Sequence, residues 1–229
     1  MDRDQLEDVG ALSALGDPTR RRAYDHVAAE GRPVGREEVA AALGIGRTLA
    51  AYHLDRLAAD GLLSVSYERR SGRSGPGAGR PAKMYDRSER ELVVSVPPRD
   101  YGLAARLLAH AAAHDEHGET RRALRAAADS LGREIAAEAP EPPVLEPLLR
   151  ARGYEPFEDE DGVMRLRNCP FHAVAQTHPE VVCDMNLRLL EGLLAGLDAP
   201  GCEATLEPGP GRCCVAIRRG DRSGRSGTA

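Results

Sequence analysis

The chain has 229 residues, of which 41% are hydrophobic and 29% charged, a composition typical of soluble globular proteins. This length suits two modules. The sequence has no run of about 18 apolar residues that could cross a bilayer, and its N-terminus lacks the apolar stretch of a secretory signal. We therefore expect a cytoplasmic protein without a membrane span.

The charge pattern excludes a uniformly basic nucleic-acid binder. The formal net charge is −5. Lys83 is the one lysine among 31 basic residues, which indicates a bias toward arginine along the whole chain. A high arginine content is therefore weak evidence for nucleic-acid binding. Residues 1–98 carry 15 basic and 15 acidic side chains, and 16 basic and 21 acidic side chains follow. The acidic excess belongs to the C-terminal half.

The N-terminal third contains three helical patterns. The first begins at Asp17 and Pro18, which suit an N-cap and a first helical turn, and it ends at Gly31. Two further patterns within 36–62 flank a tight turn at residues 44–46. This order is that of a helix-turn-helix.

A predicted β-hairpin follows these helices. Its strands are LLSVSYERR and AKMYDRS, and they flank the Gly-rich loop SGRSGPGAGRP. We expect ELVVSVPP at 91–98 to add a third strand. The hairpin would form the wing of a winged helix-turn-helix.

The third helical pattern places Ala50, Leu54 and Leu57 on one buried face, so the opposite face is free to enter a major groove. We interpret His53, beside the buried stripe, as structural. The residues expected to contact bases or phosphates from this helix are Arg47, Thr48, Ala51, Tyr52 and Arg56. The residues expected to contact phosphates from the hairpin are Arg69, Arg70, Arg73, Arg80 and Lys83.

Three segments carry a family resemblance over about the first 95 residues. LGDPTRRRAYDHV, LGIGRTLAAYHLDRLAADGLL and GRPAKMY together resemble the ArsR/MarR-like winged-helix repressors. One departure is Gly46, where that family often has a serine cap. The resemblance implies a repressor that binds double-stranded DNA.

The remainder of the chain predicts an α+β, mainly helical architecture. Two Ala- and Leu-rich helices are expected at 101–115 and 120–138, and the prolines at 140–143 mark a boundary. The predicted organisation is a winged helix-turn-helix domain at 1–98, a helical linker and dimerisation region at 99–139, a small α+β sensor domain at 140–219 and a disordered tail at 220–229. We expect a homodimer, because a helix-turn-helix commonly reads two half-sites.

All five cysteines lie between Cys169 and Cys214, and a cytoplasmic location argues against disulfides. NCPFHAVAQTHPEVVC and PGPGRCCV resemble the sensor domain of SufR-type iron–sulfur repressors. The resemblance implies that Cys169, Cys183 and one of Cys213 or Cys214 bind a cluster, of the [4Fe-4S] type. It also implies that the cluster-bound protein represses and that cluster loss releases DNA.

Adjacent residues on a strand point to opposite faces, so we expect only one of Cys213 and Cys214 to be a ligand and favour Cys213. Cys202, His172, an acidic residue or an external ligand remain open for the fourth position. Zinc, a thiol redox switch and plain buried cysteines are alternatives to a cluster.

The sequence also offers two other functions. An enzyme with Cys169 as nucleophile and His172 as base is not expected, because a CPFH tetrapeptide does not establish the required geometry. A small-molecule pocket lined by leucines of 187–194 is possible, but these leucines fit an ordinary core better. We therefore predict a non-enzymatic, DNA-binding transcriptional regulator.

Overall fold

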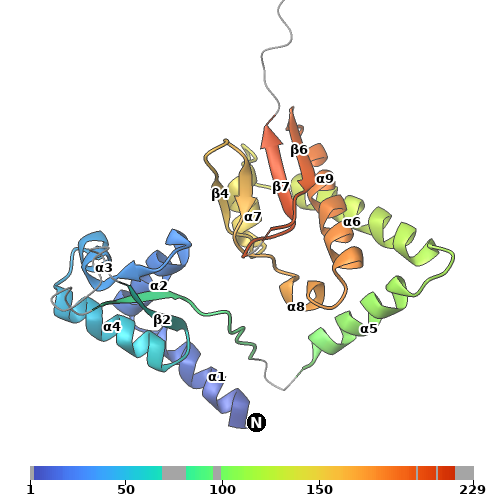
Figure 1. Ribbon diagram of the computed structural model, residues 1–229. Coiled ribbons are helices and arrows are strands. Elements are labelled where there is room, and N and C mark those ends of the chain that lie inside the picture. The colour runs from blue at the N-terminus through green and yellow to red at the C-terminus, as the bar shows by residue number, and fades with distance from the viewer. Residues whose placement is uncertain (1–2, 69–80, 95–98, 200, 210, 220–229) are drawn as a thin grey trace, which may run out of the picture. The chain divides into compact units, whose positions relative to one another are not determined.

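The computed structural model describes residues 3–68, 81–94, 99–199, 201–209 and 211–219 (Figure 1). It divides into two compact units, Met1–Arg99 and Asp100–Ala229. Both combine helices with a small antiparallel sheet, so the chain is α+β, as predicted. Among the helices described, none is long and apolar enough to cross a membrane.

The first unit contains four helices and three strands in its described part. In chain order they are α1 (Arg3–Ala14), α2 (Pro18–Glu30), β1 (Val34–Gly35), α3 (Arg36–Leu43), α4 (Arg47–Ala59), β2 (Leu63–Glu68) and β3 (Ala82–Arg87).

Local chemistry sets the ends of these helices. The carboxylate of Asp17 caps α2 by accepting a 2.8 Å hydrogen bond from the backbone N–H of Arg20. Gly31 and Gly44 end α2 and α3 with φ of 64° and 69°, a left-handed conformation that favours glycine. Ala50, Leu54 and Leu57 of α4 are fully buried, as their spacing predicts.

The sheet of the first unit has the strand order β1-β3-β2. β2 and β3 pair antiparallel, with Val65 opposite Tyr85, and Val34 of β1 pairs with the other side of Tyr85. The prediction of a third strand at 91–98 is wrong for its described part, since 91–94 form no strand. β1 already occupies the edge of β3, which leaves no place beside β3 for a later segment.

The second unit contains a longer series of elements. In chain order they are α5 (Tyr101–Ala113), α6 (Glu119–Ala137), α7 (Leu145–Ala151), β4 (Pro156–Glu158), β5 (Met164–Leu166), α8 (His172–Ala175), α9 (Pro179–Gly196), β6 (Cys202–Leu206) and β7 (Val215–Arg219). Its sheet is antiparallel, with the order β4-β5-β7-β6.

Helices α6 and α9 lie side by side at very short range (Figure 1). A Cβ atom on Gly132 of α6 would lie 2.2 Å from the carbonyl oxygen of Leu189, and one on Gly192 of α9 would lie 2.2 Å from that of Asp129. Backbone therefore meets backbone at this crossing. α9 also packs against the sheet, so its buried leucines form the core, as expected.

We predict that Gly192→Ala destabilises the second unit by about 1 to 3 kcal/mol, because the new methyl group must push α6 away from α9. Urea unfolding followed by circular dichroism measures the loss. The matched control is Gly10→Ala in α1, where no atom lies within 4 Å of the new Cβ. Equal stability of Gly192→Ala and the wild-type protein would contradict the close packing.

Candidate functional site

α4 carries five of the ten residues predicted to contact DNA. Arg47, Thr48 and Tyr52 are exposed, whereas Ala51 is half-buried. Gly46 precedes α4 without a side-chain hydrogen bond to its first turn. His53 is buried, which fits its interpretation as a structural residue.

An acidic residue that the sequence analysis missed lies on this helix. Asp55 Oδ1 accepts hydrogen bonds from Lys83 Nζ at 2.5 Å and from the Tyr85 hydroxyl at 2.7 Å. Burial, and then the bond to Asp55, raises the pKa of Tyr85, so its hydroxyl remains a donor. These contacts tie α4 to β3. The signal for them was the two-residue spacing of Lys83 and Tyr85, which puts both on one face of a strand.

Two of the predicted DNA-contacting cations thus have carboxylate partners. Lys83 pairs with Asp55, and Arg56 Nε lies 3.0 Å from Asp60 Oδ2. Both pairs are partly exposed and therefore weak enough to exchange for phosphate. The predicted hairpin contacts at Arg69, Arg70, Arg73 and Arg80 lie outside the described residues.

The second unit brings four of the five cysteines together. Cys169 lies in the loop before α8, Cys183 lies on α9, and Cys213 and Cys214 immediately precede β7. The Cys183 and Cys214 Sγ atoms are 2.9 Å apart, and the thiol of Cys169 donates a hydrogen bond to Cys213 Sγ. Because Cys213 and Cys214 are adjacent in the chain, the two pairs of thiols lie next to each other.

The prediction that Cys213 and Cys214 lie on a strand is wrong. β7 begins only at Val215, so the two cysteines lie on a bend and not on a strand. The bend lets Cys213 face Cys169 while Cys214 faces Cys183. Both cysteines therefore contribute to the cluster of four thiols, which we call the cysteine site.

The two thiols in the deeper part of the cysteine site differ in acidity. The hydrogen bond from Cys169, assisted by a backbone N–H of Val215, lowers the pKa of Cys213 to about 7 in spite of burial. The same bond, followed by burial, raises the pKa of Cys169. Burial also raises the pKa of Cys183.

Two buried polar side chains extend from Cys213 into the core. Asn186 Nδ2 of α9 donates to Cys213 Sγ at 3.3 Å, and the hydroxyl of Tyr154 donates to Asn186 Oδ1. Asn186 is 1% exposed and Tyr154 is 3% exposed. The sequence analysis assigned no role to either residue, because an asparagine within a leucine-rich helix gives no indication of its partner.

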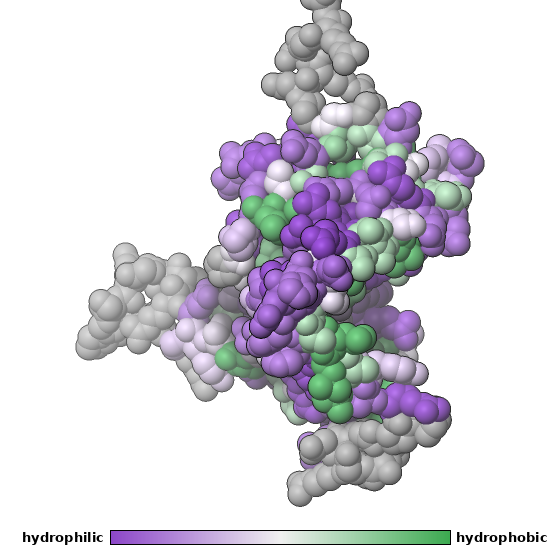
Figure 2. Space-filling model, turned by 90° about the vertical axis from the view of Figure 1, so that its right-hand side faces the viewer, coloured by the Kyte–Doolittle hydropathy of each residue, from purple (hydrophilic) through white to green (hydrophobic). Residues whose placement is uncertain are grey.

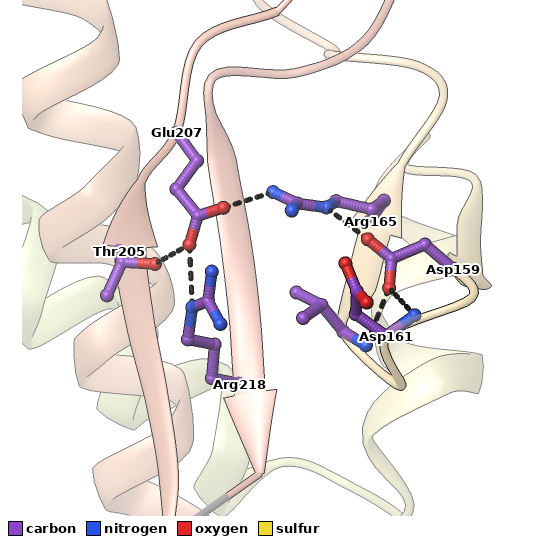
Figure 3. Close-up of polar contacts among 7 residues, drawn as sticks. Asp159, Asp161, Arg165, Thr205, Glu207 and Arg218 are labelled. Carbon is purple, nitrogen blue, oxygen red and sulfur yellow. Dashed lines mark hydrogen bonds and ion pairs between the residues drawn. The ribbon is translucent and has the colours of Figure 1, made fainter.

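An ion-pair network centred on Glu207, shown in Figure 3, is hydrogen-bonded to the Cys213–Cys214 bend. Glu207 lies between two arginines, with Oε2 2.6 Å from Arg165 Nη1 and Oε1 2.7 Å from Arg218 Nε. The backbone N–H of Glu207 donates to the carbonyl of Cys214 at 2.6 Å. The network therefore connects β5, β7 and the segment after β6 to the cysteine site.

The residues considered for a fourth ligand position are placed differently. Cys202 begins β6 and lines a shallow pocket with Glu191 and Leu194 of α9. His172 begins α8, where its Nε2 lies 3.0 Å from the side-chain nitrogen of Gln176. Within the described ranges, no three His, Cys, Asp or Glu side chains are already arranged around a single metal ion.

Comparison with known proteins adds no relative: no family model, no curated protein and no solved structure matches the chain. The arrangement of its own residues must therefore support any functional assignment.

We predict that the Glu207 network stabilises the second unit in a pH-dependent way. Hydrogen bonds from Arg218 and then Arg165 lower the pKa of Glu207 from 4.5 to about 2. A lowered folded-state pKa gives stability that is complete above the unfolded value and is lost as the pH falls from about 4.5 towards 2.

Glu207→Gln should accordingly be less stable than the wild-type protein in urea at pH 7, and this difference should shrink steadily below pH 4. Glu203→Gln on the neighbouring β6 is the control, because Glu203 is exposed. A difference for Glu207→Gln that stays constant with pH would contradict the role of the ion pairs.

Proposed function

We propose that the protein is a DNA-binding transcriptional regulator, acting as a repressor, whose operator affinity is controlled by an iron–sulfur cluster. The observation that carries this proposal is the convergence of Cys169, Cys183, Cys213 and Cys214 in the second unit. The first unit, for its part, exposes one face of α4.

The first unit supports the DNA-binding part. α3, a three-residue turn and α4 have the order of a helix-turn-helix, and the β2–β3 hairpin follows in the position of a wing. Arg47 can donate a bidentate pair to guanine, and the methyl group of Thr48 can meet thymine. The first backbone N–H groups of α4 have no side-chain cap and can donate hydrogen bonds to a phosphate oxygen.

The cysteine site supports the cluster part. Its donor set is four thiols, the usual ligands of such clusters, and each ligand binds a different iron, so the four need not surround a single point. A bound cluster would supply sensitivity to oxidation and to iron supply. The residues that would hold it are Cys169, Cys183, Cys213 and Cys214.

α9 can transmit a conformational change from the cysteine site to α6. Cys183 belongs to α9, which packs backbone to backbone on α6, and the neighbouring Asp184 pairs with Arg125 of α6 at 2.5 Å. A shift of α9 therefore acts on α6. Site occupancy can change DNA affinity only if the two conformations bind the cluster differently, and typical couplings of about 1 to 3 kcal/mol give about 5- to 150-fold effects.

The second candidate function is sensing by the cysteines without a cluster. The 2.9 Å separation of Cys183 and Cys214 Sγ favours a thiol redox switch, and four thiols also suit zinc. A small apolar effector would need another site. Analysis of iron, zinc and sulfide in protein purified without oxygen separates these alternatives.

A homodimer is part of the proposal. α5 exposes several large apolar side chains, and Figure 2 shows apolar patches among hydrophilic side chains on the face it views. The exposed apolar residues of α5 are Tyr101, Leu103, Leu107 and Leu108. α9 covers the inner face of α6, so α5 offers the better dimer interface.

We predict that Arg47→Ala weakens specific operator binding by about 1 to 3 kcal/mol and relaxes sequence preference, because a bidentate base contact is lost. Titration of operator and scrambled duplexes at one salt concentration measures both effects. Arg122→Ala on α6 removes the same charge from the second unit and is the control. If operator affinity and sequence preference are both unchanged, Arg47 does not contact the bases.

We also predict that Cys169→Ser loses bound iron and sulfide and, with them, about 5- to 150-fold of operator affinity under anaerobic conditions. The control is Cys202→Ser, a cysteine outside the cysteine site, which should keep both. Full cluster content in Cys169→Ser would overturn the ligand assignment. Cluster loss with unchanged affinity would overturn the regulatory role alone.

A further inference from the structure

We propose that Asn186 is a positioning residue that orients the Cys213 sulfur and raises the reduction potential of the cluster bound there, with Tyr154 fixing its side-chain amide. This inference rests on the proposed function, since it concerns the same site. Asn186 would touch no iron and would act only through Cys213.

An asparagine at position 186 of α9 is unfavourable if only the stability of the fold is considered. It lies on the buried face of the helix, whose neighbours on that face are Val182, Leu189 and Leu190. A buried amide must be hydrogen-bonded to be tolerated, and a leucine of nearly the same shape would need no partner. The hydrogen-bond partners of Asn186 therefore indicate a role other than packing.

Those partners use both ends of the amide. Oδ1 accepts from the buried Tyr154 hydroxyl, which leaves Nδ2 directed at Cys213 Sγ at 3.3 Å. Asn186 also lies three residues after Cys183, on the same side of α9, so one helix supplies both a ligand and a hydrogen bond to another ligand.

Asn186 Nδ2 donates a hydrogen bond to the Cys213 sulfur at 3.3 Å from within the core. Hydrogen bonds to a ligating sulfur draw electron density from the iron, stabilise the reduced state and so raise the potential. The hydrogen bond from Asn186 can be removed by changing one side chain.

The test compares cluster potentials in the full-length protein after anaerobic reconstitution, by redox titration followed in the visible spectrum. The main variant is the double change Tyr154→Phe with Asn186→Leu, which removes both polar groups together and leaves neither unpaired in the core. Its potential should be more negative than that of the wild-type protein. Tyr154→Phe alone keeps the donor but frees the amide to rotate, and should give a smaller shift in the same direction.

The matched control is Asn168→Leu, the same substitution next to Cys169, where the amide donates to the carbonyl of Gly153 and not to a sulfur. It should keep the wild-type potential. An equal shift in Asn168→Leu, or a double variant with the wild-type potential, would overturn this inference alone. If the double variant binds no cluster, Tyr154→Phe decides, and its unchanged potential overturns the inference. Wild-type protein without iron and sulfide would overturn the proposed function and this inference together.

Discussion

The contact between α6 and α9 has no room for side chains, because Gly132 and Gly192 each face a backbone carbonyl of the other helix. This constraint fixes the position of α9 along α6 and the rotation of α9 about its own axis. One face of α9 then meets the sheet, and Cys183 and Asn186 are directed towards the bend before β7. The cysteine site thus depends on two residues that carry no side chain and lie in different segments of the chain.

Periodic patterns predicted the helices well, since burial repeats along one element and needs no knowledge of its neighbours. The spacing of Ala50, Leu54 and Leu57 indicated the buried face of α4, and Asp17 indicated where α2 begins. Contacts between distant segments were harder. The pairing of β1 with β3 involves a two-residue strand, which is too short to show an alternating pattern.

The cysteine site was predictable in its members but not in its arrangement. Clustering of the cysteines in sequence, together with a resemblance, named the four residues that the structure brings together. The strand predicted at Cys213 and Cys214 was wrong, because β7 starts one residue after Cys214 and no local sequence pattern marks that start. Asn186 and Tyr154 were missed for a related reason, since their hydrogen bond joins residues 32 positions apart.

The bend that carries Cys213 and Cys214 is joined to the sheet on both sides. The N–H of Cys213 donates to the carbonyl of Leu166 at 2.8 Å, and the carbonyl of Cys214 accepts from the N–H of Glu207 at 2.6 Å. Two neighbouring thiols are therefore held by the backbone of β5 and of the segment after β6. Little conformational entropy remains for this bend to lose when a ligand binds, so its affinity for a ligand is reduced less than that of a free loop with the same two cysteines.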